Sequence, residues 1–452
     1  MSLAILNKAI LKKDINLVEP ITEKVIQFGT GVLLRGLPDY FIHKANEKGI
    51  FNGKIVVVKS TTQGGIAEFS SQDNLFTHCI RGVYQGALVN DSFVNSAISR
   101  VVEAKKDWNQ LIALAHNENI EVIISNTTEA GLIFDGNDVL GPDAPNSFPA
   151  KLLVLLFARW QHFEGAIDKG WVILPTELVP NNADVLLNII LKLAKKHSLP
   201  EAFVHWVSQA NEFCNTLVDR IVPGKLNDME MHELENKLGY RDQLLISSEP
   251  FALWAIEAKK PTTLAKISFA TIDDRVVVAP SIVKYRELKL RLLNGTHTFS
   301  CAVAIMAGFS TVIEAMQNKA FNHFITGLAL EEIVPCVVSD TISENEAIEF
   351  AKSVLERFSN PFIAHHWTSI AMNYEEKMKM RNQFLMEKYI LLNDKPAEKM
   401  ALGFAAFVLY MEKEHEKQIE ILNFCNHQAF IDQVEEWKEK INNIGIKTIL
   451  GI

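Results

Sequence analysis

The N-terminal half of the chain alternates short apolar runs with helical patterns, and this alternation limits the fold more than any other feature. The apolar runs are rich in β-branched residues and too short to be helices. Parallel strands need a crossover between them, usually a helix, so strict alternation favours a parallel sheet. We expect strands at residues 24–29, 54–60, 120–126 and 171–175, and helices at 32–49, 107–117 and 183–197.

The second half has a different character. After the apolar run at 276–282, the patterns are nearly all helical, with breaks at Gly308, 360–361 and 394–396. One β-hairpin is predicted in the first half, around Gln85-Gly86. The predicted fold class is therefore α/β, with a Rossmann-like domain at residues 1–280 followed by a mostly α-helical substrate and catalytic domain at 281–452.

Composition narrows the possible partners. The 452 residues are 48% hydrophobic and carry a net charge of −9, which favours neither nucleic acid nor an anionic membrane. The five cysteines are scattered and form no CxxC pair, which argues for a reducing compartment and against a cysteine zinc site. The N-terminus lacks a signal-peptide core, and the longest apolar run, 401–411, is too short to span a bilayer. We therefore expect a cytoplasmic protein.

The stretch "VIQFGTGVLLRG" predicts a glycine-rich turn of the kind that binds a dinucleotide. Gly29 allows a tight turn, Gly31 lets the backbone approach a pyrophosphate, and the following helix offers N–H donors. Gly36 comes two positions later than in GxGxxG, and an ordinary strand–helix turn is the alternative. The candidate cofactor-binding residues are Val25, Ile26, Gln27, Phe28, Gly29, Thr30, Gly31, Val32, Leu33, Leu34, Arg35 and Gly36.

The second predicted strand ends without the usual acid. Lys59 and Ser60 stand where Asp or Glu would hold the ribose 2′-hydroxyl of NAD. A cation at this place could accept the 2′-phosphate of NADP, or Lys59 could simply be solvated. The residues alone therefore leave the choice between NAD and NADP open.

The stretch "KLRLLNGTH" puts three polar side chains in a run that otherwise predicts a buried helix. At about 100° per residue, Lys289, Asn294 and His297 share one side of that helix. Buried polar groups without partners cost several kcal/mol, so these three either satisfy one another or line a cavity. Taken singly, each also fits an ordinary role: a surface lysine, a capping asparagine or a core histidine.

The same trio suits carbonyl reduction, in which negative charge develops on oxygen. Lys289 is the candidate acid in reduction and base in oxidation, with a pKa that burial would lower. Asn294 can donate its amide N–H to the oxygen, and His297 can hold a substrate hydroxyl or orient Lys289. We expect these three residues to be catalytic.

Four stretches together resemble a known family, the polyol-specific long-chain dehydrogenases of the mannitol dehydrogenase group. Lys289, Asn294 and His297 match its Lys-x4-Asn-x2-His signature. "SNTTEAG" at 125–131 resembles the family's strand end near the nicotinamide, which adds Asn126 to the cofactor contacts. "TLVDRIVPG" and "SEPFALWAIE" resemble two further blocks in the expected order.

Within the group, "ANEFCNTLVDRIVPG" and "LNGTHT" resemble the branch that reduces hexuronates. The resemblance implies reversible reduction of D-tagaturonate to D-altronate by NADH, without a metal and with a small sugar acid as partner. The family leans towards monomers. Alternatives are fructuronate reduction, mannitol 2-dehydrogenase activity, a mannitol-1-phosphate dehydrogenase, or a catalytically inert nucleotide-binding protein.

Substrate contacts follow from the same resemblance. The family's second oxyanion asparagine falls in "PTELVPNNAD", where Leu178 cannot donate, so Asn182 is the candidate, and Glu177 is either a proton path to Lys289 or part of a salt bridge. Asp219 matches a position near substrate hydroxyls, with a structural Asp219–Arg220 capping role as the alternative. A substrate carboxylate needs a cation, but Lys377, Lys379 and Arg381 cannot all face one way on a helix. We expect Lys377 to bind the carboxylate, with His365 as a second contact and Arg357 as a further candidate.

Overall fold

The computed structural model describes residues 3–11, 22–60, 66–127 and 131–452. The chain forms two compact units. Unit 1 comprises residues 1–81 and 90–282, and unit 2 comprises residues 82–89 and 283–452. The chain therefore passes between the units three times, and the segment 82–89 belongs with the C-terminal unit, a detail that linear domain boundaries do not contain.

Unit 1 is built on a six-stranded parallel sheet, as predicted. Its strands are β1 (Thr22–Phe28), β2 (Gly53–Lys59), β5 (Ile98–Glu103), β6 (Val122–Ser125), β7 (Val172–Pro175) and β8 (Glu212–Phe213). Their order is β5-β2-β1-β6-β7-β8, and every neighbouring pair is parallel. The central strands are buried on both faces, which explains why they read as continuous apolar runs.

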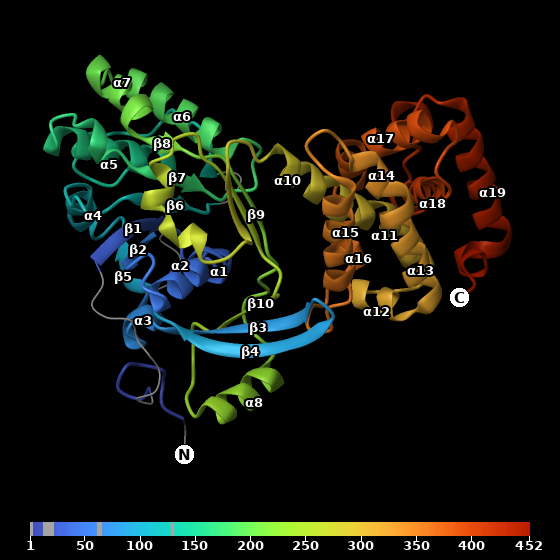
Figure 1. Ribbon diagram of the computed structural model, residues 1–452, viewed down its shortest axis with the longest axis horizontal. Coiled ribbons are helices and arrows are strands. Elements are labelled where there is room, and N and C mark those ends of the chain that lie inside the picture. The colour runs from blue at the N-terminus through green and yellow to red at the C-terminus, as the bar shows by residue number, and fades with distance from the viewer. Residues whose placement is uncertain (1–2, 12–21, 61–65, 128–130) are drawn as a thin grey trace. The chain divides into compact units, whose positions relative to one another are not determined.

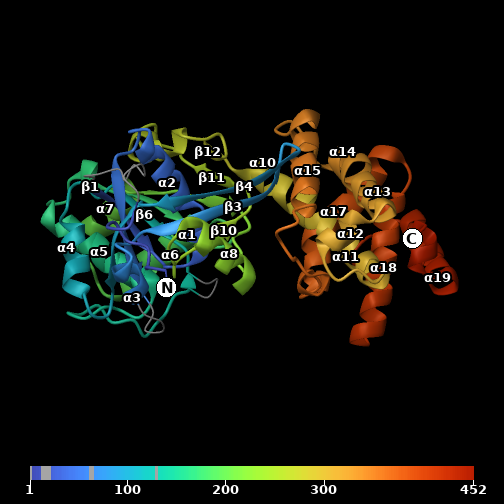
Figure 2. The same cartoon turned by 90° about the horizontal axis from the view of Figure 1, so that it is seen from below.

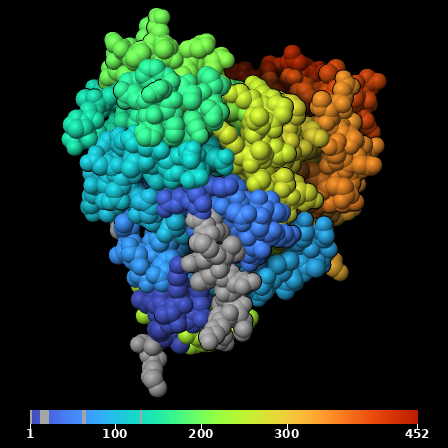
Figure 3. All heavy atoms as spheres, turned by 60° about the vertical axis from the view of Figure 1, so that its left-hand side comes forward, coloured from blue at the N-terminus to red at the C-terminus, as the bar shows by residue number. Residues whose placement is uncertain are grey.

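Helices cover both faces of this sheet (Figures 1 and 2). One face packs on α4 (Trp108–Ala115), α5 (Phe148–His162), α6 (Asn182–Lys196) and α7 (Glu201–Ala210). These helices form a continuous cyan-to-green surface in Figure 3. The other face packs on α1 (Val32–Gly36) and α2 (Pro38–Glu47). The single helix predicted at 32–49 is therefore wrong in one respect: it breaks at Leu37, because Pro38 suits the first position of a new helix.

Two smaller sheets complete unit 1. One has the order β10-β3-β4 and the other β12-β11-β9. Their strands are β3 (Phe76–Tyr84), β4 (Ala87–Asn95), β9 (Thr216–Asp219), β10 (Ile246–Ser248), β11 (Leu253–Glu257) and β12 (Val276–Ala279). The short helices α3 (Ala67–Ser71), α8 (Asp228–Leu238) and α9 (Thr263–Lys266) connect them. The predicted hairpin is β3–β4, and Gln85 and Gly86 both have positive φ, as its tight turn requires.

Unit 2 is helical, as predicted. Its α-helices are α10 (Val283–Leu288), α11 (Thr296–Met306), α12 (Val312–Gln317), α13 (Lys319–Gly327), α14 (Val334–Val337), α15 (Glu344–Phe358), α16 (Trp367–Ile370), α17 (Tyr374–Asn393), α18 (Glu398–His415) and α19 (Gln428–Leu450). Two π-helical segments, η4 (Lys289–Gly295) and η5 (Leu328–Ile333), lie between them. The buried helix α11 packs against α16, α17 and α18 at the centre of the core.

Among the helices that the structure describes, none is both long and apolar enough to cross a membrane. All five cysteines are buried and free.

Candidate active site

The glycine turn follows β1 and uses its three glycines for different reasons. Gly29 has φ +131°, and an added Cβ would lie 2.8 Å from the Leu34 side chain and 3.0 Å from the Asn126 carbonyl oxygen. Gly36 allows close packing, since a Cβ there would lie 2.7 Å from Val222. A Cβ on Gly31 would meet no protein atom within 4 Å, so the space beside it is open to a ligand.

That open space is part of a cavity of about 550 Å³ at the carboxyl ends of β1, β2 and β6. Ligands of open parallel sheets bind at this edge, and the volume suits a small-molecule site. The cavity and the glycine turn together fit a dinucleotide. The lining residues are Phe28, Gly29, Thr30, Gly31, Lys59, Ser60, Asn126, Thr127, Gly131, Ile133, Asp135, Asn146, Ser147 and Phe148.

The predicted cofactor residues divide into two groups. Phe28, Gly29, Thr30, Gly31 and Asn126 line the cavity. The others do not: Val32 and Leu33 are half-buried in the first helical turn, and the buried side chains that support the turn are Val25, Ile26, Gln27, Leu34 and Arg35, together with Gly36. Residues 128–130 of the "SNTTEAG" stretch lie outside the described residues.

Sequence reasoning missed the far wall of this cavity, which the segment from Ile133 to Phe148 provides. Asp138 accepts hydrogen bonds from the backbone N–H groups of Asn146 and Ser147, both at 3.0 Å, and so fixes the end of this segment. The available signal was the Ser147–Phe148–Pro149 sequence, which is typical of a helix start, and Ser147 does cap α5.

Glu177 holds the cavity edge in place. Its carboxylate accepts hydrogen bonds from the Thr127 N–H at 2.9 Å, the Thr127 hydroxyl at 3.0 Å and the Ser125 hydroxyl at 3.2 Å. Burial raises the pKa of Glu177. Asn126 is fixed beside it, because its amide donates to the Thr176 carbonyl oxygen at 2.9 Å. These contacts give Glu177 a structural role, and its role in a proton path stays a prediction.

Lys59 lies in the same cavity and is not solvated. Its side chain is only 5% exposed, and its ammonium group lies 3.4 Å from the carboxylate of Glu103 on β5. The cation predicted at the end of β2 is therefore present, but an acid from the neighbouring strand accompanies it.

In unit 2, the signature residues lie on one continuous helix that is partly π-helical. Lys289 and Asn294 belong to the π-helical segment η4, and His297 is in the first turn of α11. The assumed rotation of 100° per residue is therefore wrong for residues 289–295. Since π-helical hydrogen bonds join residues five apart, Lys289 and Asn294 nevertheless lie one turn apart on the same side. Both are half-buried.

His297 is buried among rings and cations. Its imidazole stacks on Phe358, with ring centroids 3.9 Å apart, and meets the His365 ring edge-on at 5.3 Å. Burial, reinforced by His365, Arg357, Arg381 and Lys377, holds the pKa of His297 well below its usual value. The imidazole is therefore neutral at physiological pH. Its Nε2 is buried and has no hydrogen-bond partner among the described residues.

The cations near His297 differ in their hydrogen-bond and ion-pair partners. Arg381 donates from Nη1 to the Thr298 hydroxyl at 3.1 Å, and its buried Nε has no partner among the described residues. Lys377 donates to the Ile370 carbonyl oxygen at 2.9 Å. Within the described residues, neither forms an ion pair. Lys379, by contrast, is exposed and paired with Glu375 at 2.9 Å. The structure therefore places Lys377, Arg381 and His365 near His297, and the predicted contacts of Lys377 and His365 with a substrate carboxylate stay a prediction.

Asn182 is committed to the protein backbone. Its amide donates to the carbonyl oxygens of Pro175 at 2.9 Å and Glu177 at 3.1 Å, and its own oxygen accepts from the Thr216 N–H at 3.0 Å. Both N–H bonds are used, so the structure argues against the predicted oxyanion role of Asn182.

Asp219 ends β9 in unit 1 and is 7% exposed. The alternative was a structural Asp219–Arg220 capping role, and the structure shows which backbone groups the Arg220 guanidinium contacts. Arg220 donates to the carbonyl oxygens of Glu249 at 3.0 Å and Gly36 at 2.6 Å. It thereby ties the end of α1 to the loop before β11, and the substrate role of Asp219 stays a prediction.

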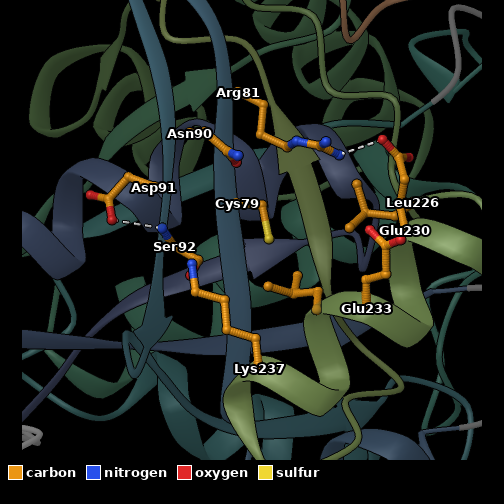
Figure 4. A pocket seen from close by; sticks show the side chains of 10 residues that line it. Cys79, Arg81, Asn90, Asp91, Ser92, Leu226, Glu230, Glu233 and Lys237 are labelled. Carbon is orange, nitrogen blue, oxygen red and sulfur yellow. Dashed lines mark hydrogen bonds and ion pairs between the residues drawn. The ribbon is translucent and has the colours of Figure 1, made fainter.

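A second cavity of about 170 Å³ lies between β3, β4 and α8 (Figure 4). Arg81 and Glu230 form an ion pair of 2.9 Å at its wall, and the Cys79 thiol points into it. It shares no residue with the predicted site. Within the described residues, no group of three His, Cys, Asp or Glu side chains could hold a metal ion.

Comparisons with known proteins identify one family over most of the chain. The family profile "Mannitol dehydrogenase Rossmann domain" matches residues 23–268, and "Mannitol dehydrogenase C-terminal domain" matches residues 281–448. The altronate oxidoreductase of Yersinia pestis is 37% identical over 88% of this chain and 81% of its own length. The Bacillus subtilis altronate oxidoreductase is 36% identical over 87% of this chain and 80% of its own length.

Solved structures share the fold at lower identity. A substrate-free D-sorbitol dehydrogenase superposes with a TM-score of 0.80 at 16% identity, covering 99% of this chain and 100% of that one. The Pseudomonas fluorescens mannitol 2-dehydrogenase complex with NAD and D-mannitol gives 0.70 at 20% identity, covering 99% and 98%. These matches confirm the predicted fold class.

Proposed function

Because the chain belongs to the mannitol dehydrogenase family, we propose that it reduces D-tagaturonate to D-altronate with NADH, and catalyses the reverse reaction. Family membership confirms the prediction of an NAD-dependent oxidoreductase that acts on a CH–OH group. The choice of substrate is supported by curated relatives named altronate oxidoreductase, which are 36–39% identical to this chain.

The observation that carries the substrate class is the group of cations around His297. A hexuronate differs from a polyol by one carboxylate, which needs a positive partner in its binding site. Lys377 and Arg381 have no ion pair within the described residues, and both depress the pKa of the neutral His297. Unpaired, half-buried cations are costly for a protein that binds only neutral sugars, so they favour an acidic substrate.

The signature residues take the catalytic roles in this proposal. When bound, NADH supplies the hydride. Lys289 gives a proton to the carbonyl oxygen in reduction and takes it back in oxidation. Asn294 donates a hydrogen bond to the same oxygen as its negative charge develops. The neutral His297 holds a substrate hydroxyl through its Nε2, which has no hydrogen-bond partner in the described part of the chain.

Side-by-side assays test the substrate. We expect NADH oxidation to be fastest with D-tagaturonate, slower with D-fructuronate, and slowest with the neutral ketose fructose. Fastest turnover with fructose would contradict the carboxylate argument, and inhibition by inorganic phosphate would favour a sugar-phosphate substrate.

A single substitution tests the chemistry. Lys289→Ala is expected to lower kcat by about 10²- to 10⁴-fold, the usual worth of a positioned acid, while NADH still binds in a fluorescence titration. Lys379→Ala, which removes an exposed lysine paired with Glu375, is the matched control and should keep activity. If turnover survives in Lys289→Ala, the acid–base role is wrong.

A further inference from the structure

The acid that is missing from the end of β2 is present one strand away. Lys59 and Glu103 are register partners in the parallel pair β2–β5, so both stand at the carboxyl edge of the sheet. Their charged groups lie 3.4 Å apart. The side chain of Glu103 is 19% exposed, which leaves it partly accessible.

Glu103 is held as an anion. A hydrogen bond from Lys106 at 2.8 Å, together with Lys59, lowers the pKa of Glu103 below its usual value. Lys106 itself is 73% exposed, so solvent screens its charge more than that of the buried Lys59. The Glu103 carboxylate therefore offsets the charge of Lys59, which lines the cavity.

The remaining charge in the cavity has the same sign as Glu103. Among the lining residues, Lys59 and Asp135 are the ones that carry charge. With Lys59 paired, the described wall of the cavity offers no uncompensated cation. A phosphate brought there would face the Asp135 carboxylate and, behind Lys59, the Glu103 carboxylate 3.4 Å from the ammonium group.

We infer that Glu103 is a specificity-determining residue, which makes the cavity select NADH over NADPH by pairing with Lys59. The inference rests on the proposed function, because it assumes that the cavity binds the adenosine half of the dinucleotide. In dinucleotide folds, the end of the second strand meets the ribose 2′-position. A lysine alone at this place attracts a 2′-phosphate, whereas a lysine paired with a carboxylate does not, and the carboxylate repels the phosphate.

Fluorescence titration of NADH and NADPH with Glu103→Gln tests the inference without any substrate. Removing the carboxylate should tighten NADPH binding relative to NADH by about tenfold or more, and the gain should shrink at high salt. Glu121→Gln is the matched control, because Glu121 also pairs with a lysine, Lys24 at 3.9 Å, but precedes β6 at the opposite edge of the sheet. It should keep the wild-type ratio.

A double variant identifies the cause. In Lys59→Gln/Glu103→Gln the gain for NADPH should disappear, because the released cation is gone. Glu103→Ala serves as a second single variant if the glutamine variant folds poorly. An unchanged ratio of the two dissociation constants in either folded variant would overturn the inference, even though both dinucleotides bind. Failure of both to bind the wild-type protein would overturn the proposed function as well.

Discussion

Arg381 is a side chain in unit 2 that is suited to recognise a carboxylate. Its guanidinium is oriented by Thr298, whose hydroxyl in turn donates to the Asn294 carbonyl oxygen at 2.8 Å. The chain of contacts therefore runs from the signature helix to a cation that has no acidic partner among the described residues. An arginine can bind both oxygens of a carboxylate at once, which a lysine cannot.

Arg381→Gln should separate acidic from neutral substrates. We expect kcat/KM for tagaturonate to fall about 10- to 100-fold, because a hydrogen bond to a charged group is worth about 1.5–3 kcal/mol. The low activity with fructose should change little. Lys379→Gln, two residues earlier on the same helix but exposed, should change neither rate. An equal loss with both substrates would show that Arg381 acts through folding.

Asp39 gives the protein a pH-dependent stability. It is fully buried, and desolvation raises its pKa from 3.8 to about 8, although Arg35 offsets part of this effect. Between these values the folded protein holds a proton that the unfolded chain has lost. The contribution of Asp39 to the free energy of unfolding therefore falls as the pH rises from about 4 to 8, by about 1.4 kcal/mol per pH unit.

Asp39→Asn removes this dependence. The free energy of unfolding of the variant minus that of the wild type should be about 2–3 kcal/mol larger at pH 8 than at pH 6. Urea unfolding at the two pH values measures it. A difference that does not change with pH would show that Asp39 keeps its ordinary pKa.

At the scale of single residues, the sequence predicted what depends on neighbours along the chain. The Gly29-x-Gly31 spacing predicted the turn, and the structure shows the close contacts that make glycine necessary at positions 29 and 36. The pairing of Lys59 was not predictable, because Glu103 is 44 residues away and reaches it only through sheet register. The contact of Asn182 with Thr216, 34 residues away, was hidden for the same reason.

At the scale of elements, apolar periodicity predicted whether a segment is a helix or a strand, but not whether a helix is an α-helix or a π-helix. The helix through Lys289 was expected, but nothing in the apolar pattern distinguishes a π-helical stretch from an α-helix. The break at Leu37 was visible as Pro38 and was missed. The second π-helical segment, η5, contains Glu332, whose buried carboxylate contacts the first turn of α18.

Glu332 caps α18 in place of a local side chain. The residue before α18, Ala397, offers no cap, and the carboxylate of Glu332 accepts from the N–H groups of Lys399 at 2.9 Å and Met400 at 2.8 Å. Glu332 is 4% exposed. Removing it leaves buried donors unsatisfied, so Glu332→Ala should lower the free energy of unfolding by about 1–3 kcal/mol in urea titrations.

The adjacent Glu331 supplies the control. Its side chain is 64% exposed and pairs with Lys399 at 2.8 Å on the surface. Exposed ion pairs are worth at most about 1 kcal/mol, so Glu331→Ala should cost less than Glu332→Ala. Equal losses in the two variants would mean that the cap of α18 contributes nothing beyond a surface pair.

At the scale of the whole molecule, the alternation of strand and helix patterns predicted the parallel sheet. The absence of strand patterns after residue 282 predicted the helical unit. The two passages of the chain on either side of residues 82–89 were not foreseen, because a hairpin carries no signal for where its tip packs. Residues 82–89 belong to unit 2, where the N–H groups of Gln85 and Gly86 donate to Glu356 at 3.1 and 2.9 Å.

Glu356→Ala should release the hairpin tip. Amide hydrogen exchange at Gln85 and Gly86 should become faster, while the global free energy of unfolding falls by no more than about 1 kcal/mol, since the bonds are exposed. Glu349→Ala removes an exposed glutamate of the same helix, paired with Lys352, and should leave that exchange unchanged. Unchanged exchange in Glu356→Ala would show that these bonds do not hold the tip.

The triple passage of the chain also sets a rule for building hybrids from relatives of this enzyme. A chimera spliced at residue 282 would take the hairpin tip from one parent and Glu356, its receptor, from the other. If the two parents differ in the tip or at position 356, the chimera would lose the hydrogen bonds that hold the tip. Moving the eight tip residues together with the C-terminal half avoids this loss.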